Sequence, residues 1–370
     1  MSVDMARPGP GSGPGGVPSA IAVSPILSAR IRTQDLDRIR DAAPGARIVN
    51  LSMEGLADGP LEDVEVLLRG WLSSEAFDRL LARAPRLLWV HSATSGVERA
   101  LTLAALERRI TVTNARGVFT RPIAEHVLML ILAISRRLPQ LLELQRERTW
   151  QPLEGVELRE LTIGIVGYGS IGRAVASLAG AFGARVIALR RHPDWSMPSR
   201  ADGHRVDPSS DGPADDAGDH RDLAFPFAPA PFRVVGPDGL HELLAASDIV
   251  VLSAPLTPET EDMIDAAALA VMGREAWIIN VARGRLIDDR ALVDALREHR
   301  IGGAALDAFR EEPLRPTSPF YELGNVIVTP HTAWSSARVL ERSIDLFCEN
   351  LRRYSHAEPL RNVVDPGAGY

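Results

Sequence analysis

The sequence predicts an α/β fold with two domains, each built on a doubly wound parallel sheet. Short apolar runs alternate with helical patterns along most of the chain, and this alternation is typical of parallel sheets covered by helices. It comes as two series, and a glycine-rich loop follows the first strand of the second series. The 370 residues, 45% of them hydrophobic, are enough for about two such domains.

The first series is expected to contain five strands, with helices that begin near Thr33, Ser74 and Val97. These strands are expected at residues 20–23, 47–51, 64–68, 87–91 and 110–113. The second series begins at Leu161 and keeps the same alternation. Its strands are expected at residues 161–166, 185–189, 248–254, 276–282, 303–307 and 325–329. Two α/β units therefore share one chain.

Between the two series, residues 122–137 predict a helix that is apolar on nearly every side. Pro122 stands where the first turn of a helix tolerates proline. The leucines of this region exceed a single stripe, so the helix needs burial on several sides. They are Leu128, Leu130, Leu132, Leu138, Leu141 and Leu142. The domain junction could bury them, but we expect a subunit contact and hence a homodimer formed through residues 122–142.

Two segments lie outside the alternation. Residues 1–18 are rich in Gly and Pro and predict a flexible tail, without the cationic start or apolar stretch of a signal peptide. Residues 194–231 carry Asp, Gly, Pro and Ser with few apolar residues, and predict a mobile surface insertion. No scaffold fixes the geometry of its metal-ligand types, so no metal site is expected. Those side chains are Asp215, Asp216, Asp219 and His220.

The composition excludes several classes of protein. A net charge of -7 and a pI near 5.8 provide no broad positive field, so neither nucleic acid nor an anionic membrane is an expected partner. All 41 basic residues are Arg. Without a lysine, the chain cannot be a pyridoxal enzyme, a Schiff-base aldolase or a P-loop NTPase.

The single cysteine, Cys348, cannot form an intrachain disulfide, which fits a reducing compartment. Its apolar neighbours predict a helix on which the thiol is a buried spectator. The longest apolar run covers residues 127–134, far short of the roughly 20 residues that a membrane span needs. We therefore expect a cytoplasmic protein without a transmembrane helix.

The glycine-rich loop has the pattern G-x-G-x-x-G between a strand pattern and a helical pattern, which is typical of a dinucleotide-binding, Rossmann-like domain. Gly167 is expected to make the tight turn, Gly169 to let the backbone approach a pyrophosphate, and Gly172 to let the helix pack on the strand. The other cofactor contacts expected in this loop are Tyr168, Ser170 and Ile171.

Two arginines, Arg190 and Arg191, follow the next expected strand. An NAD enzyme usually carries an acidic residue there, which binds the 2′-hydroxyl of the ribose. Guanidinium groups at that position suit the 2′-phosphate of NADP instead. We expect NADP to be preferred. The alternative is that both arginines are solvated and that NAD binds as well.

Three ionisable residues stand at later strand ends, where open α/β sheets bind ligands: Arg283, Glu312 and His331. With them and five further motifs, the sequence resembles the D-isomer-specific 2-hydroxyacid dehydrogenases over roughly residues 86–365. These motifs are S-G-V-E at 95–98, I-A-E-H at 123–126, S-D-I-V at 247–250, P-L-T-P-E-T at 255–260 and P-L-R-N-V-V-D at 359–365.

The resemblance implies a substrate-binding domain made from both chain ends, residues 19–119 and 332–370, and a dinucleotide-binding domain of residues 120–331. It implies that backbone N–H groups of Ser95 and Gly96 hold the substrate carboxylate. For Trp334 we weigh a wall of the substrate pocket against ordinary core packing. Further cofactor contacts implied by the family are Ala254, Pro255, Thr260, Val281, Ala282 and Asp307.

The implied reaction is the reduction of a small 2-keto acid by NAD(P)H to a D-2-hydroxy acid, with glyoxylate and hydroxypyruvate as candidate substrates. Hydride delivery to the keto carbon creates an alkoxide, which needs a cationic acid. His331 is the expected acid, and Glu312 is expected to orient it and favour the imidazolium form. Arg283 is expected to hold the substrate carboxylate and polarise the ketone.

Other interpretations stay open. Phosphoglycerate, formate and phosphite dehydrogenases also resemble this chain, and they would oxidise different acids. The C-terminal binding proteins, corepressors that sense nucleotides, share the H-T-A-W stretch of residues 331–334. The presence of Arg283, Glu312 and His331 together favours catalysis over nucleotide sensing.

Overall fold

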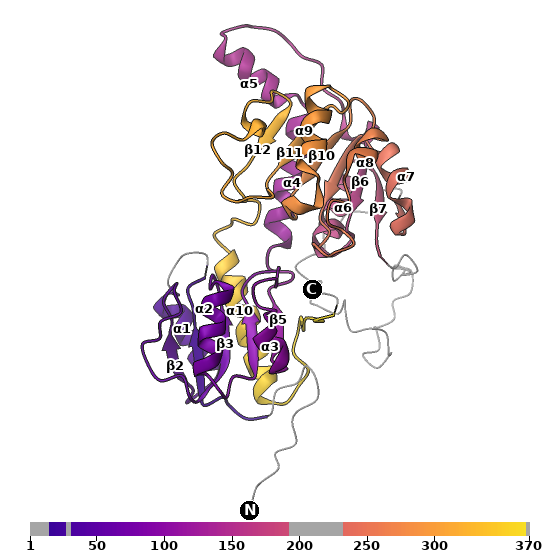
Figure 1. Cartoon of the computed structure of the whole chain (residues 1–370). Helices are drawn as coiled ribbons and strands as arrows, with labels where there is room; N and C mark the ends of the chain where they lie inside the picture. Colours follow the sequence, from indigo (N-terminus) through magenta and orange to yellow (C-terminus); the bar gives the residue numbers. More distant parts are fainter. Residues whose placement is uncertain (1–14, 27–30, 192–231, 368–370) are drawn as a thin grey trace, which may run out of the picture. The chain divides into compact units, whose positions relative to one another are not determined.

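The computed structural model describes residues 15–26, 31–191 and 232–367. These residues belong to two compact units, drawn in Figure 1. Unit 1 lies within Met1–Phe119 and Ser336–Tyr370, and unit 2 lies within Thr120–Ser335. The insertion expected at 194–231, with its four metal-ligand types, lies outside the described residues, as does most of the tail expected at 1–18.

The sheet of unit 1 has five parallel strands in the order β2-β1-β3-β4-β5. They are β1 (Ala20–Val23), β2 (Arg47–Asn50), β3 (Val64–Arg69), β4 (Trp89–Ser92) and β5 (Thr111–Asn114). Every residue of β1, β3 and β4 is buried. Such continuous burial is expected where helices cover both faces of a parallel sheet.

The helices described in unit 1 are α1 (Thr33–Ala42), α2 (Ser74–Arg83), α3 (Leu103–Glu107) and α10 (Val339–Ser355). The C-terminal helix α10 packs against α1 and shares a core with β1 through Ile344, Phe347 and Leu351. These residues recur every three or four positions and so lie on one helical face. Cys348 lies beside them and is buried as predicted, and burial raises the pKa of its thiol to about 11.

The sheet of unit 2 has seven parallel strands in the order β12-β11-β10-β9-β6-β7-β8. They are β6 (Thr162–Val166), β7 (Arg185–Leu189), β8 (Phe232–Val235), β9 (Ile249–Leu252), β10 (Trp277–Asn280), β11 (Gly303–Leu306) and β12 (Val326–Val328). The chain winds outward from β6 through β7 to β8, then returns to β9 on the other side of β6. The carboxyl ends of β6 and β9 therefore flank the switch point at which doubly wound sheets bind ligands.

The helices of unit 2 are α4 (Thr120–Ser135), α5 (Leu138–Arg146), α6 (Ser170–Ala181), α7 (Leu240–Ala245), α8 (Ala266–Ala270) and α9 (Asp289–Arg297). Helix α4 packs against α6. Helix α9 begins where the Asp288 side chain accepts hydrogen bonds from the N–H groups of Arg290 and Ala291. Its Leu292 and Leu296 are buried in the core of this unit.

Each predicted strand overlaps an observed one, but three features differ from prediction. Strand β8, which directly follows the expected insertion, was not predicted. The helix predicted to begin near Val97 is wrong, because the N–H groups of Ala100 and Leu101 both bond to the Val97 carbonyl and close a turn. Helix α3 begins only at Leu103, where Thr102 accepts a hydrogen bond from the backbone and caps it.

The third difference concerns the helix predicted at 122–137. Arg137 adopts a left-handed conformation, with φ of 56°, and ends this helical segment. The leucines that were counted with it, Leu138, Leu141 and Leu142, therefore lie on the separate helix α5. No residue of α5 is buried.

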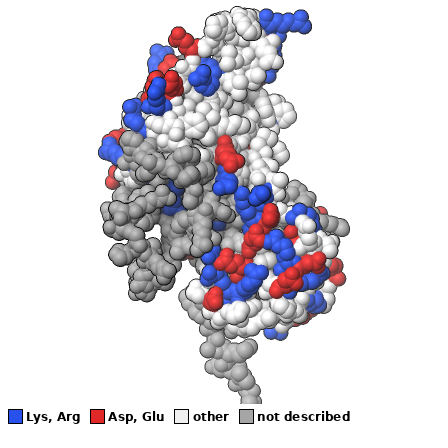
Figure 2. Space-filling model, turned by 180° about the vertical axis from the view of Figure 1, so that it is seen from behind, with Lys and Arg blue, Asp and Glu red and all other residues white. Residues whose placement is uncertain are grey.

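Charges of opposite sign are intermingled on the face shown in Figure 2. In unit 1, Arg353 and Arg361 both pair with Glu349, and Arg38 pairs with Asp345. Partly exposed pairs of this kind contribute little stability, roughly 0 to 1 kcal/mol each. In the described part of the chain, no helix combines the length and apolar character needed to cross a membrane.

Candidate functional site

The candidate residues of unit 2 follow the carboxyl ends of its strands. Because all seven strands are parallel, these ends lie at one edge of the sheet. The residues that follow β6, β7, β9, β10, β11 and β12 are, in that order, Gly167, Arg190, Ala254, Arg283, Asp307 and His331. Side chains that are far apart in the sequence thus share one edge.

His331 and Glu312 are joined by a hydrogen bond at this edge. The imidazole Nδ1 lies 2.7 Å from Glu312 Oε2, and Glu312 Oε1 accepts a bond of 2.9 Å from the Phe309 N–H. Burial raises the pKa of Glu312, but the hydrogen bonds from His331 and Phe309 and the charges of His331 and Arg283 together hold that pKa below its ordinary value. Glu312 is thus a carboxylate that orients the imidazole.

The far side of the His331 ring is available to a ligand. The side chain is 39% exposed, and its Nε2 has no hydrogen-bond partner among the described residues. Since a carboxylate accepts the Nδ1–H, the ring can donate from Nε2 only as an imidazolium. The pair therefore has the geometry of a general acid with its orienting carboxylate.

Arg283 lies on a turn that Asn280 holds from both sides. Asn280 Nδ2 donates to the Arg283 carbonyl at 3.0 Å, and Asn280 Oδ1 accepts from the Ala282 N–H at 3.0 Å. Asn280 is buried, so these bonds also satisfy its amide. Asn280 therefore has a structural role in this turn. Arg283 itself is partly exposed, and its Nη1 donates to the Ala282 carbonyl at 2.8 Å.

Asp307 is only 1% exposed, and its carboxylate is occupied by the segment that carries His331. Oδ1 accepts from the Thr329 hydroxyl at 2.6 Å and from the Thr332 N–H at 2.9 Å. Oδ2 accepts from the Ala333 N–H at 2.9 Å. These bonds lie on both sides of His331 in the chain, so Asp307 holds the backbone around it.

The glycine loop is built around close backbone contacts. Gly167 is left-handed, with φ of 99°, and a Cβ on it would lie 2.4 Å from the Ala254 nitrogen. A Cβ on Gly172 would lie 2.3 Å from the Gly167 oxygen. Gly169 precedes α6 without a side-chain cap, and a Cβ there would meet no atom within 4 Å. The first turn of α6 therefore faces open space, with backbone N–H groups that suit an anion.

Tyr168, Ser170 and Ile171 complete this loop. Tyr168 is buried, and burial raises the pKa of its hydroxyl although Arg173 and Arg190 act against the rise. Ser170 and Ile171 are half-buried in the first turn of α6. These residues share the loop with the three glycines, as the strand–loop–helix pattern predicts.

The other predicted cofactor contacts lie at neighbouring strand ends. Arg191 Nη2 lies 3.4 Å from Glu259 Oε2 in an exposed pair, while Arg190 is half-buried. Thr260 donates to the Pro255 carbonyl at 2.7 Å, which closes the loop after β9. Val281 and Ala282 are buried after β10. Trp334 is half-buried three residues after His331.

Ser95 and Gly96 follow β4 in unit 1. The Thr94 hydroxyl donates to the Gly96 carbonyl at 2.7 Å, and Asn114 Nδ2 donates to the Ser95 carbonyl at 3.0 Å. The N–H groups of Ser95 and Gly96 donate to no atom of the described residues. Their carbonyls are thus fixed while their donors stay available.

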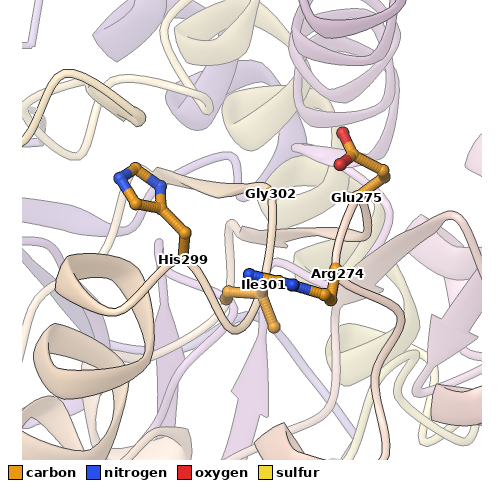
Figure 3. A pocket seen from close by; sticks show the side chains of 5 residues that line it. All are labelled: Arg274, Glu275, His299, Ile301 and Gly302. Atoms are coloured by element: carbon orange, nitrogen blue, oxygen red, sulfur yellow. The ribbon is translucent and has the colours of Figure 1, made fainter.

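A pocket of about 370 Å³ lies elsewhere in unit 2, at the amino ends of β10 and β11. Figure 3 shows His299 and Glu275 on opposite sides of it, with Arg274 and Ile301 below. None of the predicted site residues lines it. Among the described residues, no group of three or more His, Cys, Asp or Glu side chains is arranged to hold a metal ion.

Two residues near the site had no predicted role. His126 Nε2 lies 3.3 Å from the Thr329 hydroxyl, although the sequence marked His126 only as part of the I-A-E-H motif. Ser253 donates to the Gly167 carbonyl at 2.7 Å. A histidine at the start of the apolar run of residues 127–134 was the one available signal for His126, and no signal pointed to Ser253.

The amino-acid sequence matches a known protein family. The family model for the D-isomer specific 2-hydroxyacid dehydrogenase, NAD binding domain, matches residues 128–209 and 229–333. The chain is 31% identical to the glyoxylate reductase of Korarchaeum cryptofilum over 340 residues, which is 90% of each chain. The D-3-phosphoglycerate dehydrogenase of Mycobacterium tuberculosis is 34% identical over 78% of this chain, but the chain spans only 49% of that relative.

Two solved structures resemble the chain along its length. A D-isomer specific 2-hydroxyacid dehydrogenase from Xanthobacter autotrophicus Py2, in complex with NADPH and MES, has a TM-score of 0.77 at 29% identity and covers 95% of this chain and 100% of its own. An NADPH-dependent glyoxylate/hydroxypyruvate reductase from Sinorhizobium meliloti, in complex with NADP and sulfate, has a TM-score of 0.75 at 25% identity, with the same coverage of both chains.

Proposed function

Because this chain belongs to the D-isomer specific 2-hydroxyacid dehydrogenase family, we propose that Arg283, Glu312 and His331 carry out its reaction. The chain is an oxidoreductase that reduces 2-keto acids with a nicotinamide cofactor. One observation supports the assignment of these three residues. It is the 2.7 Å contact between His331 Nδ1 and Glu312 Oε2, at the sheet edge that also bears Arg283.

The glycine loop fits the pyrophosphate of a dinucleotide. Side chains at Gly167 or Gly172 would collide with the backbone, whereas the space over Gly169 is open. The uncapped first turn of α6 would donate N–H groups to the phosphates. When bound, the nicotinamide supplies the hydride that reduces the keto carbon.

His331 supplies the proton. The imidazolium donates Nε2–H to the alkoxide oxygen that forms as the hydride arrives, and it becomes a neutral ring with its proton on Nδ1. Glu312 stabilises the imidazolium through the same hydrogen bond that orients it. A depressed pKa keeps Glu312 ionised throughout the neutral range.

Arg283 binds the substrate. Its planar guanidinium can hold a carboxylate with two parallel hydrogen bonds and direct a third N–H at the keto oxygen. The Asn280 bonds fix the turn from which it projects. In unit 1, the N–H groups of Ser95 and Gly96 are proposed carboxylate donors, since they are available at a strand end.

NADPH is the proposed cofactor. Arg190 and Arg191 stand after β7, where a carboxylate would otherwise bind the ribose of NAD. The pair between Arg191 and Glu259 is exposed, so little free energy opposes its exchange for a phosphate. The two similar solved structures contain NADPH or NADP.

The proposed substrates are small 2-keto acids such as glyoxylate and hydroxypyruvate, as the names of the glyoxylate reductase and glyoxylate/hydroxypyruvate reductase relatives suggest. Trp334 is the proposed wall of the side-chain pocket, because it is half-buried and follows the acid closely. Phosphoglycerate oxidation is the second candidate, since a phosphoglycerate dehydrogenase also matches most of this chain.

A homodimer is the proposed assembly, formed through α5 and the segment that follows it. Leu138, Leu141 and Leu142 are between 39% and 45% exposed, and Trp150 is fully exposed. Figure 1 shows α5 projecting from the rest of unit 2. An apolar surface of this kind on a soluble enzyme is typical of a subunit contact.

The reaction is tested by following NADPH and NADH consumption with glyoxylate, hydroxypyruvate, pyruvate, phenylpyruvate and a branched keto acid. We expect turnover with a small keto acid, and a kcat/KM at least roughly 10-fold higher with NADPH, because a charged hydrogen bond to the phosphate contributes roughly 1.5 to 3 kcal/mol. Tight cofactor binding without turnover would favour the nucleotide-sensing alternative.

Substitution of the two arginines tests the cofactor proposal. Arg190→Ala with Arg191→Ala should raise KM for NADPH and leave KM for NADH nearly unchanged. Arg290→Ala removes an exposed arginine from α9 and serves as the matched control. Equal losses with both cofactors would contradict the proposed role of these arginines.

A further inference from the structure

His126 lies inside an apolar helix and is directed at the segment that carries His331. It belongs to α4 and is half-buried. Its Nε2 lies 3.3 Å from Thr329 Oγ1 and 3.9 Å from Asp307 Oδ1. The reaction proposed above assigns this histidine no step, although it contacts the Thr329 hydroxyl, which donates to the Asp307 carboxylate beside His331.

The backbone at His331 needs to be held in place. Its φ of 49° is left-handed, a conformation that costs a residue with a side chain roughly 1 kcal/mol or more. Thr329 precedes it, and the Thr329 hydroxyl donates to Asp307 at 2.6 Å. Asp307 also accepts from the N–H groups of Thr332 and Ala333. The position of Asp307 and Thr329 therefore decides where the His331 ring stands.

The direction of these hydrogen bonds identifies what His126 contributes. Thr329 has one hydroxyl proton, and the short bond to Asp307 uses it. The Thr329 oxygen is then an acceptor for His126 Nε2–H. Burial lowers the pKa of His126 more than the nearby Asp307 carboxylate raises it, so the ring is neutral near pH 7. A neutral donor fixes the Thr329 hydroxyl while the charge of Asp307 remains available to the other donors.

We infer that His126 is a positioning residue for His331, acting through the Thr329 hydroxyl and Asp307. The inference rests on the proposed function, in which His331 is the acid. His126 itself touches neither of the residues that bind or protonate the substrate. Its hydrogen bond to Thr329 holds the turn between β12 and His331 in a fixed position relative to α4.

Two variants at His126 separate hydrogen bonding from packing. His126→Phe keeps a ring but removes the donor, and it should lower kcat by roughly 10-fold to 100-fold, because small displacements of a catalytic group have effects of that size. His126→Gln can place an amide N–H near the position of Nε2, so it should restore kcat to within roughly threefold of wild type. His241→Phe, an exposed position on α7, is the matched control and should leave kcat unchanged.

A double-substitution cycle tests the route through Thr329. Thr329→Val removes the hydroxyl with little change in shape, and it should lower kcat as His126→Phe does. The double variant should be no slower than Thr329→Val alone, because both changes break the same contact. The dissociation constant for NADPH and the melting temperature should stay close to wild type. Losses that multiply, a slow His126→Gln variant or a wild-type kcat in His126→Phe would overturn the inference.

A readout without substrate separates this inference from the proposed function. The proton between His331 and Glu312 should produce a downfield resonance in the 1H NMR spectrum, assigned by its loss in His331→Asn. We expect this resonance to be broadened or shifted in His126→Phe and unchanged in His126→Gln and His241→Phe. If the wild type reduces no keto acid, the proposed function fails, and this resonance alone decides the role of His126. An unchanged resonance in His126→Phe would overturn that role.

Discussion

At the scale of single residues, His331 combines an unfavourable backbone with a well-satisfied side chain. Its left-handed conformation destabilises the folded state. The hydrogen bond to Glu312 and the hydrogen bonds from the neighbouring residues to Asp307 stabilise the folded state and offset this cost. Backbone strain is therefore located at His331, the residue proposed as the acid. A strained residue held from several sides is typical of a catalytic group.

Replacing His331 should abolish most of the activity without unfolding the protein. We expect His331→Ala to lower kcat by about 10²-fold or more, which is within the range of general-acid catalysis. His331→Asn is the control for the backbone, because asparagine tolerates the left-handed region better than most residues. Both variants should be equally slow in a steady-state assay. A variant with the turnover of wild type would remove His331 from the mechanism.

A second histidine, His91, has no proposed part in the reaction, but its burial changes its pKa. It is fully buried in unit 1, where its Nδ1 lies 2.8 Å from the Thr113 hydroxyl. Trp89 donates to the same hydroxyl at 2.9 Å. Burial lowers the pKa of His91 to about 3, so the folded state keeps this ring neutral where an unfolded chain would protonate it.

This difference makes stability depend on pH. The unfolded chain binds a proton at His91 below about pH 6.5, whereas the folded chain binds it only near its pKa of about 3. The free energy of unfolding should therefore be unaffected above pH 6.5, and it should fall by about 1.4 kcal/mol per pH unit below that value. Denaturant titrations of wild type and His91→Asn across pH 7 to 5 measure the effect. Equal slopes in the two proteins would contradict it.

At the scale of secondary-structure elements, the turn after β10 and the loop after β11 are pressed together. A Cβ on Gly284 would lie 1.9 Å from the Phe309 carbonyl carbon and 2.1 Å from the Arg310 nitrogen. Gly284 directly follows Arg283, and Phe309 donates its N–H to Glu312. The close approach of two backbones thus sets the separation between Arg283, the proposed substrate-binding residue, and the Glu312 carboxylate.

Gly284→Ala should separate these elements. Overpacking of this kind costs roughly 1 to 3 kcal/mol, and we expect kcat/KM to fall at least roughly 10-fold because Glu312 moves with the loop. Gly273→Ala is the matched control, since its Cβ would meet only the Ala276 Cβ at 3.9 Å. Thermal unfolding and steady-state kinetics of both variants are the measurements. Full activity in Gly284→Ala would show that the contact does not position Glu312.

At the scale of the whole molecule, α5 contacts α4 but stays uncovered by the rest of the described residues. Helix α4 packs against α6 in unit 2, but none of the residues of α5 is buried. Its exposed leucines and the exposed Trp150 would bury apolar surface in the proposed dimer.

Sedimentation velocity at micromolar concentration should therefore give the mass of a dimer. Leu141→Glu with Leu142→Glu should shift the distribution to the mass of a monomer, because charges would enter the apolar contact. Leu103→Glu changes a 79% exposed leucine on α3 of unit 1 and should leave the dimer intact. A monomeric wild type would contradict the proposed assembly, and the substitutions would then have no effect on mass.

Sequence alone located the strands that precede Gly167, Arg283 and His331, because each of these strands is a local apolar run typical of a buried strand. It missed β8 and placed the start of α3 too early. The error at α3 has a local cause, since Thr102 caps that helix and Val97 forms a turn. It assigned the leucines of α5 to α4, because a left-handed Arg137 leaves no pattern in the sequence.

The amino-acid sequence by itself determined the class of most elements, the glycine loop and the residue types that the reaction needs. These properties depend on local periodicity and on the conformational freedom of glycine. Only the tertiary structure decided which side chains meet. His126 and Thr329 are 203 residues apart in the chain, and Asp307 could be seen to bracket His331 only once β11 lay beside β12. Hydrogen-bond partners at such separations are set by strand order and helix packing, which no local pattern encodes.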